Sequence, residues 1–255
     1  MQTEIIIIPC LADNYAYLIH DKSSNRNTLV DAPEFAPIMA TLTQNNWKLD
    51  NILITHHHSD HINAINALRD KFPAVVFGAK ADSYRIPGID VELSNKDKFS
   101  ASNLIFKCIE VPGHTVGHLA FYCASEKIIF TGDSLMSLGC GRLFEGSPKQ
   151  MLSSLDLLVQ LPEDTMIYSG HEYAINNAKF ALSVDPENSD LIERSKKISK
   201  NVSLKIPNVP TSLKEEKDTN PFLRADSSKI RQNLKINQLS KLEIFTMLRR
   251  MKDDF

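Results

Sequence analysis

Short apolar runs rich in β-branched residues alternate with stretches of helical spacing over the first two thirds of the chain. Runs of four to eight such residues predict strands, and apolar residues recurring every three to four positions predict helices. The expected strands are Glu4–Pro9, Ala16–His20, Thr28–Asp31, Asn51–Thr55, Val75–Gly78, Leu104–Val111, His118–Cys123, Lys127–Thr131 and Met166–Ser169. The expected helices are Glu34–Asn45, Ile62–Lys71 and Pro148–Leu161. This mixture indicates layered sheets flanked by helices.

The pattern changes near residue 172, after which we expect no further strand. The expected helices there are Tyr173–Val184, Ser189–Asn201 and Leu239–Asp253, and a proline-containing loop is expected at 206–224. We therefore predict two domains, a mixed α and β domain over residues 1–172 and a small helical domain over 173–255.

The start of the chain and the cysteines indicate a cytoplasmic protein. The apolar run Ile5–Ile8 is too short for a signal peptide or a membrane span, and no basic stretch precedes it. Cys10, Cys108, Cys123 and Cys140 lack the close paired spacing of a zinc site. We expect them to be reduced thiols.

The net charge of −2 is unevenly distributed. Residues 1–173 carry 13 Lys and Arg against 20 Asp and Glu, a net charge of −7, whereas residues 174–255 carry 16 against 11, a net charge of +5. Either surface charge varies by chance, or the basic end helps to hold an anionic ligand near an acidic, metal-loaded body. Charge alone does not decide between these readings.

The segment ILITHHHSDH, residues 52–61, is the most informative part of the sequence. In extended backbone alternate side chains point the same way, so His56 and His58 can meet one ion while His57 faces solvent or a neighbouring loop. Asp60 and His61 follow where a helix begins and can turn toward a second ion. Imidazole and carboxylate groups are ligands of zinc, iron and manganese.

Three single ligand candidates, His114, Asp133 and His171, each follow an apolar run and a glycine that lets the backbone turn sharply. Together they describe ligands gathered at one end of a sheet. Seven candidates are too many for one tetrahedral ion and suit two ions that share a bridging carboxylate. His118 is expected to support the ligands rather than to bind metal.

The order HxHxDH, the His of PGHT, the Asp of TGD and the His of GHE resembles the metallo-β-lactamase superfamily. The resemblance implies an α+β fold, a four-layer αββα sandwich, followed here by a helical domain. It also implies a ligand set for each metal. The first ion would be held by His56, His58 and His114, the second by Asp60, His61 and His171, and Asp133 would bridge both.

Such a centre suits hydrolysis. Two divalent ions contribute +4, Asp60 and Asp133 remove two charges and a bridging hydroxide removes one, which leaves +1. This charge lowers the pKa of bound water to about 7 and stabilises an oxyanion. Asp60 and Asp133, with the metal-bound hydroxide, are therefore the expected catalytic groups. Zinc is the expected metal, with iron and manganese as alternatives.

Four further segments are similar to the glyoxalase II, or hydroxyacylglutathione hydrolase, family. They are LGCGRLFEG, GHEYAINNAKFAL, NPFLR and RRMKDDF. The similarity runs from DNYAYLI near residue 13 to Phe255 and includes the helical end. It implies hydrolysis of S-D-lactoylglutathione and other S-2-hydroxyacylglutathiones to the hydroxy acid and glutathione, the second step of methylglyoxal detoxification.

The residues that match the family's glutathione site are Arg142, Phe144, Tyr173, Arg249 and Lys252. Arg249 and Lys252 are cations suited to the glycine carboxylate, and we expect solvent to reach them. Alternatively, this basic run is a helix end that is favourable with the helix dipole. Many family members have Lys and Tyr in place of Arg142 and Phe144, and Phe loses a hydroxyl group. Asn63 and Ala64 also depart from a frequent Gly-Gly pair.

Other activities of this fold fit less well. A metallo-β-lactamase would carry a secretion signal and often a Cys or Ser ligand, and a sulfur dioxygenase would bind one iron and lack the helical end. A nuclease would need a concentrated basic patch, whereas residues 1–173 carry −7. A non-enzymatic scaffold would not keep ligands in all four segments. We expect a monomer with a small-molecule substrate and neither nucleic acid nor membrane as a partner.

Overall fold

The computed structural model describes residues 3–255. These residues form two compact units. Unit 1 comprises the chain up to residue 110 together with 117–132, and unit 2 comprises 111–116 and 133–255.

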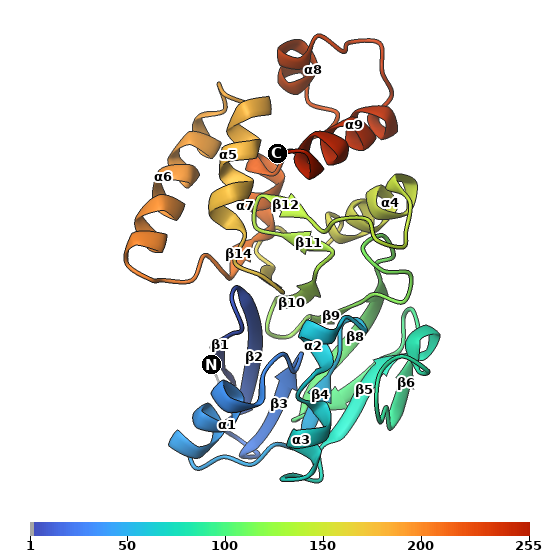
Figure 1. Ribbon diagram of the computed structural model, residues 1–255, viewed down its shortest axis with the longest axis vertical. Helices are drawn as coiled ribbons and strands as arrows, with labels where there is room; N and C mark the ends of the chain where they lie inside the picture. The colour runs from blue at the N-terminus through green and yellow to red at the C-terminus, as the bar shows by residue number, and fades with distance from the viewer. Residues whose placement is uncertain (1–2) are drawn as a thin grey trace. The chain divides into compact units, whose positions relative to one another are not determined.

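Unit 1 contains a six-stranded sheet whose strands follow in chain order (Figure 1). The strands are β1 (Thr3–Cys10), β2 (Asn14–Asp21), β3 (Arg26–Val30), β4 (Asn51–Leu53), β5 (Val75–Ala79) and β6 (Val91–Leu93). The first three pair antiparallel, and β3 to β6 pair parallel. Parallel strands end at the same edge of a sheet, so the segments after β3 and β4 lie close together.

Helices α1 (Phe35–Gln44) and α3 (Ile65–Arg69) cover one face of this sheet (Figure 1). Their apolar side chains are buried against the strands in one core. That core includes Leu18, Leu29, Ile38, Leu42, Ile52, Ile54, Ile65 and Leu68. All four cysteines are buried and free, as the predicted thiols require.

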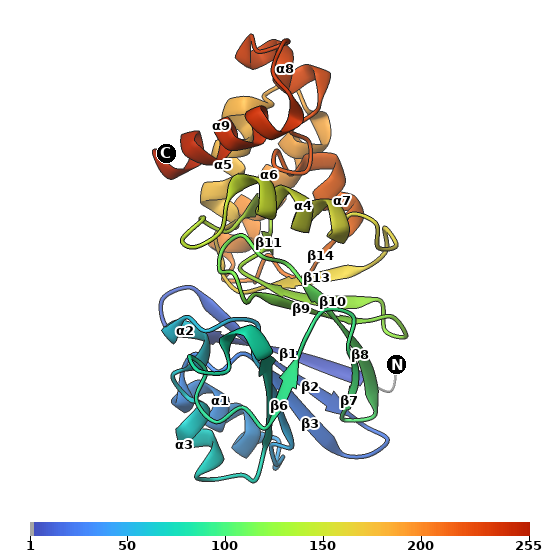
Figure 2. The same cartoon turned by 90° about the vertical axis from the view of Figure 1, so that its right-hand side faces the viewer.

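A second set of antiparallel strands in unit 1 packs on the other face of the sheet (Figure 2). These strands are β7 (Lys98–Ala101), β8 (Leu104–Glu110), β9 (Leu119–Cys123) and β10 (Ile128–Gly132). The rings of Phe77 and Phe99 stack with centroids 4.9 Å apart, and those of Tyr17 and Phe130 lie 5.5 Å apart. Aromatic packing therefore joins the two sheets.

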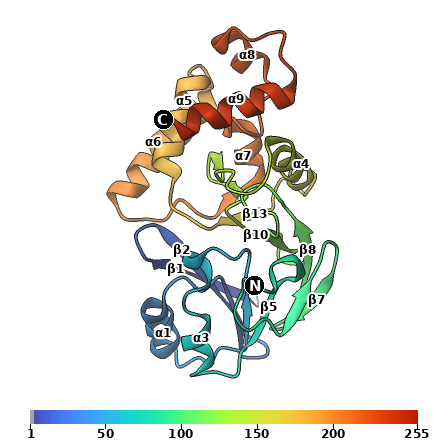
Figure 3. The same ribbon diagram turned by 45° about the vertical axis from the view of Figure 1, so that its right-hand side comes forward.

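Unit 2 is mainly helical. Its helices are α4 (Pro148–Leu158), α5 (Ala174–Val184), α6 (Ser189–Ser203), α7 (Leu213–Thr219), α8 (Ser228–Leu234) and α9 (Lys241–Asp253). Figure 3 shows α5 and α6 side by side. Capping boxes begin α4, α7 and α9, where a serine side chain and the side chain three residues later bind each other's backbone. Within residues 3–255 no helix has the length and apolar content to span a bilayer.

Short strands complete unit 2, and several escaped the sequence-based expectation. They are β11 (Leu135–Met136), β12 (Gly139–Cys140), β13 (Met166–Ser169) and β14 (Thr211–Ser212), and β13 pairs with β14. The expectation of no strand after residue 172 is therefore wrong, because a two-residue strand has no periodic pattern. The expected loop at 206–224 is also wrong over β14 and α7. Strands β6 and β7 and helix α8 were not expected either.

The predicted helix Ile62–Lys71 is divided into α2 (Ser59–Ile62) and α3. The backbone of Ala32, just after β3, accepts from the Ala64 N–H at 2.9 Å and donates to the His61 carbonyl at 2.8 Å. These bonds replace part of the helical ladder and interrupt the helix. All nine expected strands and the other expected helices overlap observed elements, with ends shifted by a few residues.

Candidate metal centre and substrate cavity

His56 and His58 follow β4 in an extended segment, and their rings lie close together, edge to face. Nε2 of His56 lies 3.1 Å from Nδ1 of His58. Two nitrogens bound at 2.0–2.1 Å to a tetrahedral ion are separated by about 3.3 Å, so this spacing suits one shared ion. Oγ1 of Thr55 lies 3.0 Å from Nδ1 of His56, so Nε2 is the atom that could coordinate an ion. The two side chains therefore point the same way, as the alternation of extended backbone predicted.

Asp60 and His61 lie in the first turn of α2 and form a second pair. Oδ2 of Asp60 lies 3.7 Å from Nε2 of His61. The Asn14 side-chain amide donates to the same Asp60 oxygen at 2.9 Å and holds the carboxylate in place. Like the first pair, this one offers a nitrogen and a neighbouring ligand atom on the same side of the loop.

Asp31 orients His61 and was missed by the sequence analysis. It follows β3 at a backbone φ of 58°. Its Oδ2 accepts from Nδ1 of His61 at 2.8 Å, and the carboxylate also accepts from the backbone and hydroxyl of Thr55 at 2.8 and 2.9 Å. The run LVD has the same form as the segment before Asp133, an apolar strand followed by aspartate, and could have revealed it.

In unit 2, Asp133 lies between two histidines. Its Oδ2 is 3.4 Å from Nε2 of His114 and 3.2 Å from Nε2 of His171. Nδ1 of His114 donates to the Arg142 carbonyl at 2.7 Å, which leaves Nε2 free of a proton and able to coordinate. A single carboxylate oxygen close to two imidazole nitrogens is the arrangement that a bridging ligand requires.

Glycines allow the close approaches around these ligands. Gly132, directly before Asp133, has a φ of +47°, and a side chain there would meet Thr55 at 2.6 Å. A Cβ at Gly141 would overlap the backbone oxygen of Asp133 and lie 2.9 Å from Nδ1 of His114. Gly113 also has a positive φ, so the predicted role of glycine before the ligands is confirmed at two positions.

All seven predicted ligands belong to groups of His and Asp side chains that could hold a metal ion. Imidazole nitrogens and carboxylate oxygens suit zinc, iron and manganese. The two other histidines of these segments have supporting positions. The ring of His118 stacks on His56 at 4.6 Å, and His57 faces Asp82 at 3.1 Å, in the neighbouring loop. The chain therefore contains a His and Asp cluster able to bind divalent metal ions.

A cavity of about 230 Å³ in unit 2 contains four of the five predicted substrate-binding residues. It is lined by Met136, Cys140, Gly141, Arg142, Tyr173, Asn176, Asn177, Arg249 and Lys252. Phe144 is not among these residues. Its exposed ring packs edge-on against His114 with centroids 5.3 Å apart, and the Tyr173 ring stacks on His171 at 4.7 Å. An aromatic ring thus lies beside each of these two predicted ligands.

The cations of the cavity differ in their surroundings. Arg249 is only 6% exposed and donates to the Cys140 carbonyl at 2.7 Å and to Asp253 at 2.9 Å. The expectation that solvent reaches Arg249 is therefore wrong. The Lys252 ammonium lies near the rings of Phe180 and Phe255. Burial, together with the nearby Arg249 and Arg142 cations, lowers the pKa of Lys252, while Asp253 opposes this shift.

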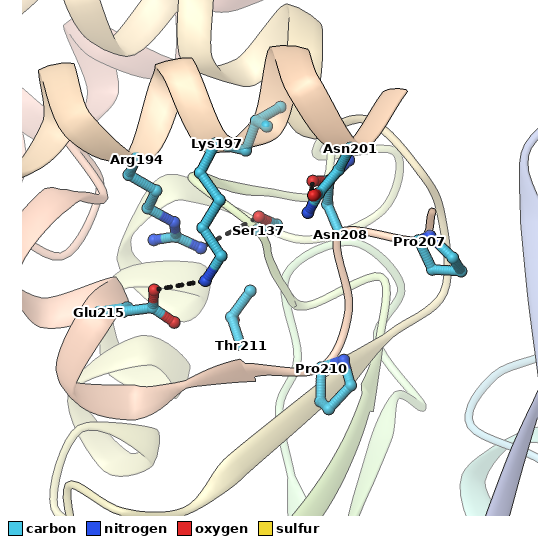
Figure 4. Close-up of a pocket in the computed structure, with 10 residues that line it drawn as sticks. Ser137, Arg194, Lys197, Asn201, Pro207, Asn208, Pro210, Thr211 and Glu215 are labelled. Carbon is cyan, nitrogen blue, oxygen red and sulfur yellow. Dashed lines mark hydrogen bonds and ion pairs between the residues drawn. The ribbon is translucent and has the colours of Figure 1, made fainter. Parts of the chain in front are cut away.

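The hairpin of β11 and β12, which contributes Met136 and Cys140 to the cavity wall, is anchored by a buried network of hydrogen bonds. Arg194 on α6 donates to Oγ of Ser137 at 3.1 Å (Figure 4). It also pairs with Glu216. The other oxygen of Glu216 accepts from the Leu138 N–H at 3.0 Å. A neighbouring cavity of about 140 Å³ beside Arg194 contains none of the predicted substrate-binding residues. The network fixes the backbone before Cys140, whose carbonyl binds Arg249.

Two sequence families match adjacent parts of the chain. Residues 12–171 match the metallo-β-lactamase superfamily, and residues 172–255 match the family described as hydroxyacylglutathione hydrolase C-terminus. Curated proteins named hydroxyacylglutathione hydrolase are similar over the full chain. The proteins from Ruegeria pomeroyi and Roseobacter denitrificans are each 48% identical over 100% of both chains, and that from Rhizobium meliloti is 43% identical over 99% of this chain and 98% of its own.

Solved structures share the fold at lower identity. The BLEG-1 B3 metallo-β-lactamase has a TM-score of 0.67 and 23% identity, covering 86% of this chain and 99% of its own. ETHE1 from Myxococcus xanthus has a TM-score of 0.67 and 23% identity, covering 98% and 97%. At these identities the likeness establishes the metallo-β-lactamase fold, here with a helical C-terminal domain.

Proposed function

Because the chain belongs to the hydroxyacylglutathione hydrolases of the metallo-β-lactamase superfamily, we propose that it hydrolyses S-D-lactoylglutathione to D-lactate and glutathione. It is a thioester hydrolase, and this reaction is the second step of methylglyoxal detoxification. The observation that carries the proposal is the cationic cavity of unit 2, which shares its unit with Asp133 and two histidine ligands.

The seven ligand candidates would hold two divalent ions. The first would take His56, His58 and His114, the second Asp60, His61 and His171, and Asp133 would bridge them. The nitrogen spacing at His56 and His58 and the position of the Asp133 oxygen between two imidazoles support this assignment. When bound, two such ions supply Lewis acidity and lower the pKa of a water molecule enough to give a nucleophile at neutral pH. Zinc is the proposed metal, and iron and manganese suit the same donors.

Asp60 and Asp133 are the proposed catalytic carboxylates. Asn14 donates to the Asp60 oxygen at 2.9 Å, and the Asp133 oxygen lies 3.4 Å from Nε2 of His114 and 3.2 Å from Nε2 of His171. Their two negative charges offset part of the charge of the ions but leave the centre net positive. A positive centre favours the negative charge that develops on the thioester carbonyl oxygen during attack.

The cavity of unit 2 would bind the glutathione part of the substrate. Arg142, Arg249 and Lys252 bring three cations to its wall, and the pKa of Lys252 is lowered partly by the other two. An incoming glycine carboxylate relieves that repulsion and gains charge-assisted hydrogen bonds. Tyr173 and Phe144 would flank the thioester end, since their rings lie on His171 and His114. Phe144 cannot supply the hydroxyl that Tyr would.

The division into a catalytic domain, 1–172, and a helical substrate-binding domain, 173–255, is part of the proposal. The junction of the two matching sequence families at 171 and 172 supports it. We also propose a cytoplasmic monomer. Four buried free thiols suit a reducing compartment, and one unit of one chain supplies every lining residue of the cavity.

The test compares three substrates with the same metal-loaded protein. We expect rapid hydrolysis of S-D-lactoylglutathione, followed by loss of thioester absorbance, and negligible turnover of a β-lactam or an RNA. Chelation should abolish the activity and added zinc should restore it. Turnover of the β-lactam or the RNA in preference to the thioester would refute the proposal.

A further inference from the structure

His57 stands between the proposed ligands His56 and His58. It takes part in a closed network of hydrogen bonds with two residues that follow β5. Its Nδ1 lies 3.1 Å from Oδ2 of Asp82, and its Nε2 lies 3.2 Å from Nη1 of Arg85. A guanidinium can only donate, so Nε2 of His57 accepts from Arg85. Nδ1 then carries the ring proton and donates it to Asp82.

Contacts between Asp82 and Arg85 close this network. Nε of Arg85 donates to Oδ1 of Asp82 at 3.0 Å, and Nη2 pairs with the same oxygen. The backbone N–H of Arg85 also donates to the backbone carbonyl of Asp82 at 2.8 Å. Asp82 is fully buried, and a buried carboxylate keeps its charge only when it is paired and hydrogen-bonded. Arg85 and His57 together satisfy both of its oxygens.

Gly117 makes room for this buried carboxylate. A Cβ at Gly117 would overlap the carboxyl group of Asp82, so only glycine permits the approach. Gly117 lies between His114 and His118 in the chain, beside the segment that carries a proposed ligand. Asp82 therefore contacts two of the loops that the metal centre uses.

We infer that Asp82 and Arg85 are positioning residues for the metal ligands His56 and His58. The inference rests on the proposed two-metal function. In extended backbone the side chain of residue i+1 points opposite to those of i and i+2. Fixing the His57 ring on one side therefore fixes its two neighbours on the other, with their nitrogens 3.1 Å apart. Without the hydrogen bonds from His57 to Asp82 and Arg85 the loop can rotate, and the two nitrogens lose this spacing.

The test uses variants of Arg85 in the full chain. Arg85→Met keeps the apolar stem and removes every donor, whereas Arg85→Lys keeps a cation near Asp82. Arg69→Met is the matched control, because Arg69 also lies in unit 1 and donates to the Gly88 carbonyl and to Asp90 away from the metal loop. Zn²⁺ affinity is measured by competition with a chromophoric chelator, and Co²⁺ binding by its visible spectrum.

We expect Arg85→Met to weaken Zn²⁺ binding about 10- to 100-fold and to alter the Co²⁺ spectrum, since loss of groups that orient ligands has effects of that size. Arg85→Lys should recover part of the affinity, and Arg69→Met should bind like the wild type. With excess Zn²⁺ the Arg85→Met protein should regain kcat, and its KM should stay within about twofold, because the proposed substrate cavity lies in unit 2.

Wild-type affinity in Arg85→Met, or an equal loss in Arg69→Met, overturns the inference. If Arg85→Met does not fold, His57→Phe is used instead. Its phenyl ring occupies the space of the imidazole but makes neither hydrogen bond, and its Zn²⁺ affinity tests the same inference. The two hypotheses fail separately. A wild-type protein that binds no Zn²⁺ refutes the two-metal function and the inference with it. A wild-type protein with two ions and full activity, beside variants of unchanged affinity, refutes the inference alone.

Discussion

Oδ2 of Asp31 lies 2.8 Å from Nδ1 of His61, at the edge of the sheet where parallel strands β3 and β4 both end. This contact fixes the tautomer of His61 and leaves Nε2 as the atom that could coordinate an ion. We predict that Asp31→Asn weakens the binding of one of the two ions by about 10- to 100-fold. Competition with a chromophoric chelator measures this loss, with unfolding by urea recorded for the metal-free protein.

Asp21→Asn is the matched control for Asp31→Asn. Asp21 is also buried, and hydrogen bonds led by that from Ser24 lower its pKa to about 2. Its loss should reduce stability without changing metal affinity. Equal metal affinity in both variants would show that Asp31 acts on stability alone.

Asp133→Asn should be among the most damaging substitutions. One Asp133 oxygen lies within 3.4 Å of two ligand nitrogens, so its replacement affects both proposed ions. We expect the metal content to fall below two ions per chain and the activity to fall by more than the about 100-fold that loss of an outer group causes. Elemental analysis and thioester hydrolysis measure the two effects.

The control for Asp133→Asn is Asp156→Asn. Asp156 lies in the same unit and pairs with Lys241 on the surface, so its variant should keep two ions and full activity. A wild-type protein that is fully active with one firmly bound ion would contradict the binuclear assignment.

The sequence anticipated the clustering of the ligand candidates, because most of them follow an apolar strand. His114, Asp133 and His171 each follow an apolar run and a glycine, and such a local pattern can be read without tertiary information. Asp31 was missed although it follows a strand in the same way, because its function depends on His61, thirty residues away. The LVD run could mark Asp31 as a candidate, but its pairing with His61 is a tertiary contact that no single segment shows.

The burial of Arg249 could not be read from the sequence for a related reason. The side chains of the RRMK run point in different directions around α9. Only the packing of that helix decides which of these cations is buried. Arg249 meets the Cys140 carbonyl, held by a hairpin more than a hundred residues earlier. Strand β14 was missed because two residues carry no periodicity and their pairing with β13 is a tertiary contact.

Lys252 and Arg249 should respond differently to truncation. Loss of a charged hydrogen-bond partner costs about 1.5–3 kcal/mol, or roughly 10- to 150-fold in binding, with solvent screening favouring the lower end. A group that binds the distant glycine carboxylate stabilises ground and transition states equally. We therefore expect Lys252→Ala to raise KM about tenfold and to change kcat by less than a few-fold.

Arg249→Ala should also destabilise the fold. It leaves the Cys140 carbonyl and Asp253 without the donors that Arg249 supplies, which costs about 1–3 kcal/mol of unfolding free energy. Urea unfolding and steady-state kinetics separate the two effects, and Lys149→Ala, an exposed cation on α4, serves as the control. Unchanged KM in folded Lys252→Ala and Arg249→Ala proteins would show that these cations do not bind the substrate. The basic run would then be only a helix end that is favourable with the helix dipole.

The alkaline limb of the pH profile should depend on Lys252. Burial and the Arg249 and Arg142 cations lower the pKa of Lys252 below its usual 10.5, while the Asp253 carboxylate raises it. Below that pKa the ammonium attracts the glycine carboxylate, and as the pH rises through it the charge is lost. We therefore predict that KM rises, and kcat/KM falls, at a lower pH than an ordinary lysine would give. Lys252→Arg stays charged throughout this range and should remove that part of the fall. The glutathione amino group and the metal centre titrate alike in both proteins, so the difference between their profiles reports Lys252. Superimposable profiles of kcat/KM would show that Lys252 does not bind the substrate as a cation.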